Sequence, residues 1–470
     1  MQRGGSILYQ ASGFRCRSGT NRLRTLATSS TRDATKESSY RVWQVPPSLG
    51  DGDPESNGGI LFERDASNKW RHLPKKSDTS FDVMELSKQA MAHFLPAQYP
   101  KSVAPGYFKF VSYYFIASVA GSASMVLSTQ TLLLAVGVAG ANAHQAGIMA
   151  GAFNWVMKDF AGQVGGVLFA SQMGKTKSFD TDPKRWRMVS AMTLDGATLL
   201  EILSPLFHAS LVLPVASVAN VGKNIGFLTA SASKAAIHNS LAIQGNLGDV
   251  TAKAGSQAIV ASLMGTTLGI GMSSFLGHDT FKFSLGFCVL AAVHQGCNYF
   301  SLKEVPLSHF NRQRLHLVLK HYIEEGEILS PKTVAVQEEF LPLPWANKPW
   351  AWLSIGSPIT SVCPDPEDWN AILQSTPSEK YVLRHSSDRI HLVFLSEASG
   401  EDIIRAVFHA HQLENLKPRA PIGTARVEES YQLTLEHFPI LLDKLEESGW
   451  KTATESISVE SSKSYRVHVP

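Results

Sequence analysis

The chain has 470 residues, enough for two or three domains, and its net charge of +3 argues against a nucleic-acid-binding protein. Its four cysteines form no C-x-x-C pair and have no histidines at zinc-finger spacing, which argues against a disulfide framework and a structural zinc site. Hydrophobic residues make up 44% of the sequence, as in soluble proteins, but they are strongly segregated along the chain.

Residues 1–35 have the composition of an organellar targeting peptide. The stretch from Met1 to Thr31 contains arginines, Ser, Thr and Gly but no Asp or Glu. Arg22 to Ser30 resembles a region cut by a matrix protease. We therefore expect a mitochondrial protein, with a plastid protein as the alternative. The other interpretation is that this segment is a disordered basic tail without a targeting function.

Residues 36–80 are polar and predict a small appendage, with strands at Ile60–Glu63 and Lys69–Leu73. The next segment, Phe81–Phe94, has the pattern of an amphipathic helix that Pro96 ends.

Residues 81–304 form a predicted helical domain that is mainly apolar. Four uncharged stretches lie within 110–157, 202–222, 254–278 and 283–302, and each reaches about the 20 residues that span a bilayer. We expect a mainly α-helical, membrane-embedded bundle of about 4–6 apolar helices. The alternative is a soluble helical bundle whose core consists of Ala and Gly.

Small residues in this domain recur at a spacing that lets helices approach closely. Three G-x-x-x-G pairs predict such contacts. They are Gly147 and Gly151, Gly222 and Gly226, and Gly265 and Gly269.

Polar residues interrupt the apolar domain in short islands. Because ionisable groups are costly inside a membrane, we expect them to face the bundle interior and to form a polar network or contact a ligand. The candidates are Asn154, Lys158, Asp159, Asp195, Lys223, Lys234, Asn246, Asp249, Lys253 and Gln257. In the island Asn154–Asp159, the end of one span and the start of the next is the favoured interpretation. In the last island, local helix stabilisation by Asp249 and Lys253 at i, i+4 is the simpler interpretation.

A basic island follows Asp182, which suits a helix N-cap, and Pro183, which suits the first helical position. Lys184, Arg185 and Arg187 are candidates for contact with acidic lipid. A solvated helix start, whose charges fix membrane topology, is the equal alternative.

No catalytic, cofactor or metal motif holds in this sequence. Met173-Gly174-Lys175-Thr176 looks like the end of a phosphate-binding loop, but Phe169 stands where the first Gly is needed. We therefore expect no enzyme, no cofactor and no metal, with an enzyme whose site is unrecognised as an alternative.

Charge returns after Glu304. Residues 305–367 predict an amphipathic helix and a Pro/Trp-rich linker, with Phe310, Leu315 and Leu319 inward and Arg312, Arg314 and Lys320 outward. Residues 368–470 predict a small α+β domain with strands at 381–384, 390–395 and 452–459 and helices at 400–413 and 428–448.

The polar islands occur in an ordered series. The segments Phe94–Val103, Asn154–Asp159, Asp182–Arg187 and Gly245–Gln257 together resemble the root UVB-sensitive protein family. The resemblance implies a helical, membrane-associated protein without established catalytic activity, and no catalytic residues come with it.

We therefore expect a non-catalytic organellar membrane protein that acts as a scaffold or as a carrier of a small solute or lipid. Its expected partners are membrane lipids and another protein, such as a family member. The alternative is a soluble organellar adaptor that binds protein partners.

Overall fold

The computed structural model describes residues 41–44, 60–64, 70–72, 93–135, 145–173, 178–277, 279–341, 350–374, 376–377, 379–386, 389–416, 424–460 and 464–468. The chain divides into two units, residues 1–83 and 84–470. In the first unit, β1 (Arg41–Gln44), β2 (Ile60–Arg64) and β3 (Trp70–His72) form an antiparallel sheet, which confirms both strands expected in the appendage. The predicted targeting peptide, and the predicted helix before His93, lie outside the described residues.

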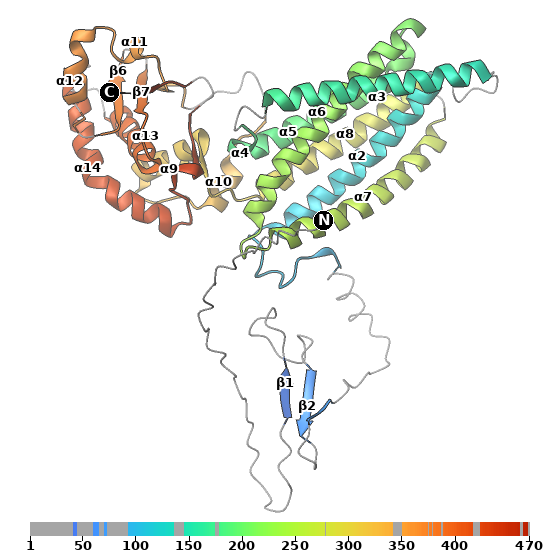
Figure 1. Cartoon of the computed structure of the whole chain (residues 1–470), viewed down its shortest axis with the longest axis horizontal. Helices are drawn as coiled ribbons and strands as arrows, with labels where there is room; N and C mark the ends of the chain where they lie inside the picture. Colours follow the sequence, from blue (N-terminus) through green and yellow to red (C-terminus); the bar gives the residue numbers. More distant parts are fainter. Residues whose placement is uncertain are drawn as a thin grey trace, which may run out of the picture. The chain divides into compact units, whose positions relative to one another are not determined.

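The second unit begins with a helical bundle (Figure 1). Its elements are α2 (Tyr107–Ala135), α3 (Gln145–Met173), α4 (Ser178–Thr181), α5 (Pro183–Ile202), η1 (Ser204–Leu206), α6 (Ala209–Leu241), α7 (Leu247–Leu276) and α8 (Thr280–Lys303). Helix α2 packs against α7 and α8, and α6 packs against α5 and α3. Helix α5 also contacts α2 and α8, so it connects the two groups.

Glycines permit the closest of these approaches, as their spacing predicts. A Cβ added to Gly226 of α6 would meet Leu194 of α5 at 2.6 Å. One added to Gly265 of α7 would overlap the backbone oxygen of Val119 on α2. Two of the three predicted G-x-x-x-G contacts are thereby confirmed; the side chains around Gly147 and Gly151 lie outside the described residues.

Three helices in the described part of the chain are long and apolar enough to cross a membrane: Tyr107–Leu133 in α2, Ser210–Leu241 in α6 and Leu247–Leu276 in α7. The mainly helical architecture is confirmed, whereas four to six spans are not. Helices α3 and α8 have the length of a span, but polar residues interrupt them, Lys158 and Asp159 in α3 and His294 and Gln295 in α8.

The chain ends in a C-terminal α+β module. Its elements are β4 (Phe310–Asn311), α9 (Arg312–Glu325), α10 (Pro331–Gln337), β5 (Leu353–Ile355), α11 (Ile359–Val362), η2 (Pro366–Asp368), α12 (Trp369–Gln374), β6 (Tyr381–His385), β7 (Ile390–Leu395), α13 (Gly400–Asn415), α14 (Thr424–Glu447), η3 (Thr454–Ser456), β8 (Ile457–Ser458) and β9 (Arg466–Val467). The central strand β7 pairs antiparallel with β6 and parallel with β5 and β9, while β4 and β8 pair in parallel separately. Side chains of α9, α13, α14 and the sheet share one apolar core.

The module is larger than the sequence predicts. Helix α9 packs in the core rather than preceding it, and the Pro/Trp-rich segment contributes β5 to the sheet. Residues 342–349 of that segment lie outside the described part. The inward positions of Phe310, Leu315 and Leu319 are confirmed, because all three are fully buried. The outward position of Arg314 is wrong, because its side chain is 1% exposed and pairs with Glu338.

Candidate functional site

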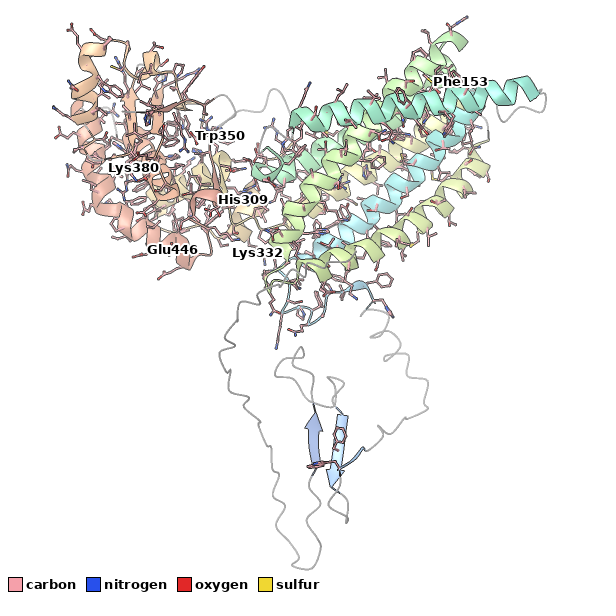
Figure 2. All side chains as sticks on the ribbon, viewed as in Figure 1. Phe153, His309, Lys332, Trp350, Lys380 and Glu446 are labelled. Atoms are coloured by element: carbon pink, nitrogen blue, oxygen red, sulfur yellow. The ribbon has the colours of Figure 1, made fainter. Side chains whose placement is uncertain are left out.

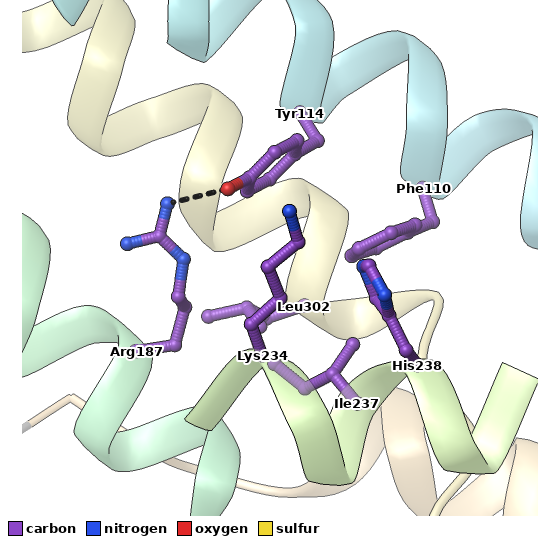
Figure 3. A pocket seen from close by; sticks show the side chains of 7 residues that line it. All are labelled: Phe110, Tyr114, Arg187, Lys234, Ile237, His238 and Leu302. Atoms are coloured by element: carbon purple, nitrogen blue, oxygen red, sulfur yellow. Dashed lines mark hydrogen bonds between the residues drawn. The ribbon is translucent and has the colours of Figure 1, made fainter. Parts of the chain in front are cut away.

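A small pocket lies at one end of the helical bundle, and we call it the Arg187 pocket. It is lined by Phe110 and Tyr114 of α2, Arg187 of α5, Lys234, Ile237 and His238 of α6, and Leu302 of α8 (Figure 3). Its volume is about 10 Å³, which is room for one water-sized group.

The guanidinium of Arg187 has a fixed orientation in this pocket. Its Nη2 donates to the Tyr114 hydroxyl at 3.2 Å, and its Nη1 donates to Ser190 Oγ at 3.3 Å. Its Cζ lies 5.2 Å from the centre of the Tyr114 ring, so a cation–π contact adds to the hydrogen bonds. Nearby, His238 Nδ1 lies 3.2 Å from Thr251 Oγ1, which holds that ring as well.

The pocket carries positive charge without a carboxylate. Arg187 is only 8% exposed and Lys234 is half-buried, yet neither forms an ion pair within the described part of the chain. The buried lysines 158, 184 and 223 of the same bundle each pair with an acidic side chain. A buried charge without a partner is costly, so this arrangement favours an anion between the two cations.

Two further polar clusters lie between the helices. Asp195 of α5 faces His294 of α8, with 2.9 Å between Oδ1 and Nδ1, and it also accepts a hydrogen bond from Gln295. Gly121 of α2 leaves room for this histidine, because an added Cβ would lie 3.4 Å from His294 Nε2. The interior position predicted for Asp195 agrees with this contact.

Lys223 of α6 pairs with Glu201 of α5, and both side chains are buried. Ser128 of α2 completes the cluster, because its hydroxyl donates to Glu201 and accepts from Lys223 Nζ at 3.1 Å. The structure therefore divides the expected network into separate pairs rather than joining it into one.

The island on α3 contacts α6. Lys158 Nζ lies 2.8 Å from Asp159 Oδ1 and 4.6 Å from the Trp155 ring centre. Asn220 donates to the Lys158 carbonyl oxygen at 3.1 Å, which joins the two helices. The side chain of Asn154 lies outside the described part.

The island from Gly245 to Gln257 contacts the segment before α2. Asp249 accepts a hydrogen bond from the Ala97 backbone N–H at 2.7 Å, and Gln257 donates to the Phe94 carbonyl oxygen at 2.6 Å. Asn246 is the N-cap residue of α7, but its side chain does not cap the helix. Lys253 is half-buried on the same helix. These contacts are structural, and the structure brings none of these four side chains into the Arg187 pocket.

The basic island does not present its three cations together. Lys184 is 1% exposed and its Nζ lies 2.9 Å from Glu338 Oε2. Arg187 lies in the pocket, and Arg185 alone is exposed to solvent. The geometry thus does not place these cations as one lipid-binding surface.

Glu338 holds two buried cations at once, because its Oε1 lies 2.9 Å from Arg314 Nη2. Burial raises the pKa of this carboxyl, but Arg314 and Lys184 outweigh it and lower the pKa to about 2. Burial lowers the pKa of Lys184 to about 8 although Glu338 opposes the change. This triad joins the bundle to the C-terminal module.

Asp182 supports the same junction. It occupies the N-cap position of α5 with Pro183 in the first turn, as predicted, but its side chain makes no capping bond. The carboxylate instead accepts a hydrogen bond from Asn311 of β4.

Sequence reasoning missed the partners His294, Glu201 and Glu338 as site residues. Each lies far along the chain from the residue it pairs with or in a segment without a motif, so local spacing carries no signal for it. The described residues contain no group of three or more His, Cys, Asp or Glu that could hold a metal ion.

Comparisons with known proteins cover most of the chain. The family model described as the vitamin B6 photo-protection and homoeostasis domain matches residues 82–326. The model described as the C-terminal domain of root UVB sensitive proteins matches residues 327–461. No solved structure matches the chain.

Three relatives illustrate how similar known proteins are to this chain. Protein root UVB sensitive 3 of Arabidopsis thaliana is 30% identical over 78% of this chain and 83% of its own length. Protein root UVB sensitive 2, chloroplastic, of the same plant is 27% identical over 81% of this chain and 84% of its own length. RUS family member 1 of Dictyostelium discoideum is 30% identical over 53% of this chain and 47% of its own length.

Proposed function

The chain belongs to the root UVB sensitive family, and from this premise we propose that it is a non-catalytic membrane carrier of an organelle that serves vitamin B6 homeostasis. The vitamin enters the proposal from the description of the matching domain. An organellar location is supported by the chloroplastic relative and by the basic N-terminal composition; we keep the mitochondrion first and the plastid as the alternative.

The observation that carries the membrane part is the apolar outer surface of the bundle. On α3, Phe153, Val156, Phe160 and Val167 are each more than 60% exposed at steps of three to seven residues, so they lie on one face. Figure 2 labels Phe153 on this helix.

Two other helices repeat this arrangement. Ile259 and Leu263 of α7, and Phe281, Leu285 and Val289 of α8, are exposed at steps of four residues. Soluble monomers rarely expose contiguous apolar patches of this kind, whereas lipid tails would cover them at no cost.

The polar interior supports a carrier over a scaffold. Ionisable residues within membrane helices commonly mark a solute or proton path. The Asp195–His294 and Glu201–Lys223 pairs lie between helices, and the Arg187 pocket lies at one end of the bundle. Membrane lipids and a second family member are the partners that we propose.

Alkaline extraction of organelle membranes tests the membrane part. We expect the chain to remain in the pellet; release into the supernatant would favour the soluble adaptor instead.

Uptake into proteoliposomes tests the carrier part. We expect labelled pyridoxine or its phosphate to enter faster than in empty vesicles, and Asp195→Asn to slow this uptake. The matched control is Glu339→Gln, which changes an exposed carboxylate outside the bundle. Uptake equal to that of empty vesicles would leave the scaffold role.

A further inference from the structure

We propose that the Arg187 pocket binds an oxygen of a phosphate group, held by Arg187, Lys234 and the Tyr114 hydroxyl. The proposal deepens the carrier function by naming the chemistry of its ligand. It rests on that function only for the choice of vitamin B6 phosphate as one probe, because anion binding follows from the pocket itself.

The first argument is charge. The two cations contribute a formal charge of about +2, and none of the other lining residues is acidic. A phosphate monoester carries about −1.5 to −2 at neutral pH, so it matches this charge, whereas a carboxylate would leave an excess of positive charge.

The second argument is the number of free donors. A guanidinium has five N–H groups, and the described contacts of Arg187 use one N–H each to Tyr114 and Ser190. Lys234 adds three donors that no described residue accepts. Because Tyr114 accepts from Arg187, its own O–H is available to an oxygen in the pocket.

The third argument is size. A cavity of about 10 Å³ admits one oxygen and not a whole phosphate. The half-buried Lys234 lines the same cavity, and its flexible side chain can reach the phosphate oxygens that remain outside it. The ligand is therefore a phosphate attached to a larger body that stays outside, either a soluble monoester or a lipid headgroup.

The arrangement is unlike the lipid-binding surface expected from the sequence. Of the three basic residues at the start of α5, only Arg187 lines the pocket. The second cation of the pocket is Lys234, which lies in the C-terminal part of α6. Figure 3 shows that the two side chains extend from the neighbouring helices α5 and α6 toward Tyr114 of α2.

Isothermal titration of the full chain in uncharged detergent tests the proposal. The probes are inorganic phosphate, pyridoxine 5′-phosphate and pyridoxine, and nanodiscs with or without phosphatidic acid. Pyridoxine phosphate lacks the aldehyde that would attach to lysines at random. We expect phosphate-bearing probes to bind and pyridoxine to bind at least tenfold more weakly.

Lys234→Met keeps the apolar stem and removes the charge. We expect it to weaken phosphate binding at least tenfold, while Lys282→Met, an exposed lysine of α8 outside the pocket, changes nothing. Arg187→Lys keeps the charge but loses the planar fork, so it should weaken binding even if the fold is intact. Circular dichroism of each variant confirms that it is folded.

Binding by pyridoxine phosphate assigns the pocket to a soluble ester, and binding by phosphatidic acid nanodiscs alone assigns it to a lipid headgroup. The proposal is overturned if no phosphate probe binds, or if Lys234→Met binds as tightly as the original chain. Phosphate binding without solute uptake would refute the carrier and leave the pocket standing, so the two failures are distinguishable.

Discussion

Replacing Glu338 by Gln should break the junction between the bundle and the C-terminal module. The carboxylate lies 2.9 Å from Lys184 Nζ and 2.9 Å from Arg314 Nη2, and both cations are 1% exposed. The variant leaves two buried positive charges facing each other. Removing one partner of a buried ion pair costs about 3–5 kcal/mol, so the unfolding equilibrium constant should rise roughly a hundredfold or more.

The loss of stability caused by Glu338→Gln should also depend on pH. Lys184 already has a pKa lowered to about 8 by burial, and without Glu338 its pKa falls further. The unfolded chain then binds more protons than the folded chain up to the ordinary lysine pKa, so the stability of the variant rises with pH. We therefore expect a smaller deficit at pH 9 than at pH 7.

Urea unfolding of the full chain in uncharged detergent, followed by tryptophan fluorescence, measures these effects. Glu339→Gln is the matched control, because it makes the same change at the exposed neighbouring residue and should stay within about 0.5 kcal/mol. Replacing Lys184, Arg314 and Glu338 together by Met should recover most of the loss. The reasoning is refuted if Glu338→Gln and Glu339→Gln unfold at the same urea concentration at pH 7.

Three other outcomes follow from the described contacts. Gly265→Ala should lower the free energy of unfolding by about 1–3 kcal/mol, because the added Cβ would overlap the α2 backbone. The control Gly271→Ala should not lower it, because its Cβ would meet nothing within 4 Å. Equal midpoints of the two variants in thermal unfolding would contradict this prediction. Glu201→Gln should reduce the yield of folded protein in detergent, because it leaves Lys223 buried without a counter-charge. Adding Lys223→Met should restore the yield. A double variant with no better yield than Glu201→Gln would contradict a stabilising role of this ion pair. The pKa of Glu338 is lowered to about 2, so its contribution to folding stability is complete above its ordinary pKa near 4.5 and is lost as the pH falls toward 2. Between pH 5 and pH 3, Glu338→Gln should therefore lose less stability than the original chain.

The sequence predicts the elements and close approaches of this fold better than its pairings. Gly226 and Gly265 lie at helix contacts because their spacing is a local property of one helix. Strands β6 and β7 agree with the predicted ones to within a residue, because a short run of apolar residues is also a local feature of the sequence.

The missed features depend on parts of the chain that meet only in the folded state. Arg314 looks solvent-exposed on the helical pattern of α9, yet a second surface, formed by α5 and Glu338, covers it. Asp195 was expected inside, but its partner His294 is on another helix and has no motif around it. The Arg187 pocket joins residues that the sequence assigned to two different roles, a lipid contact and an interior network.

Two of the parallel pairings in the C-terminal module have a consequence for biosynthesis. Strand β8 pairs with β4, and β9 pairs with β7, so both sheets are completed by strands that come after all their other strands in the sequence. Because a ribosome delivers the N-terminus first, β4 and β7 lack these partners until residues 457–467 have been synthesised. Shortened chains that end before β8 should therefore expose strand edges and engage chaperones, even though they retain every helix of the bundle.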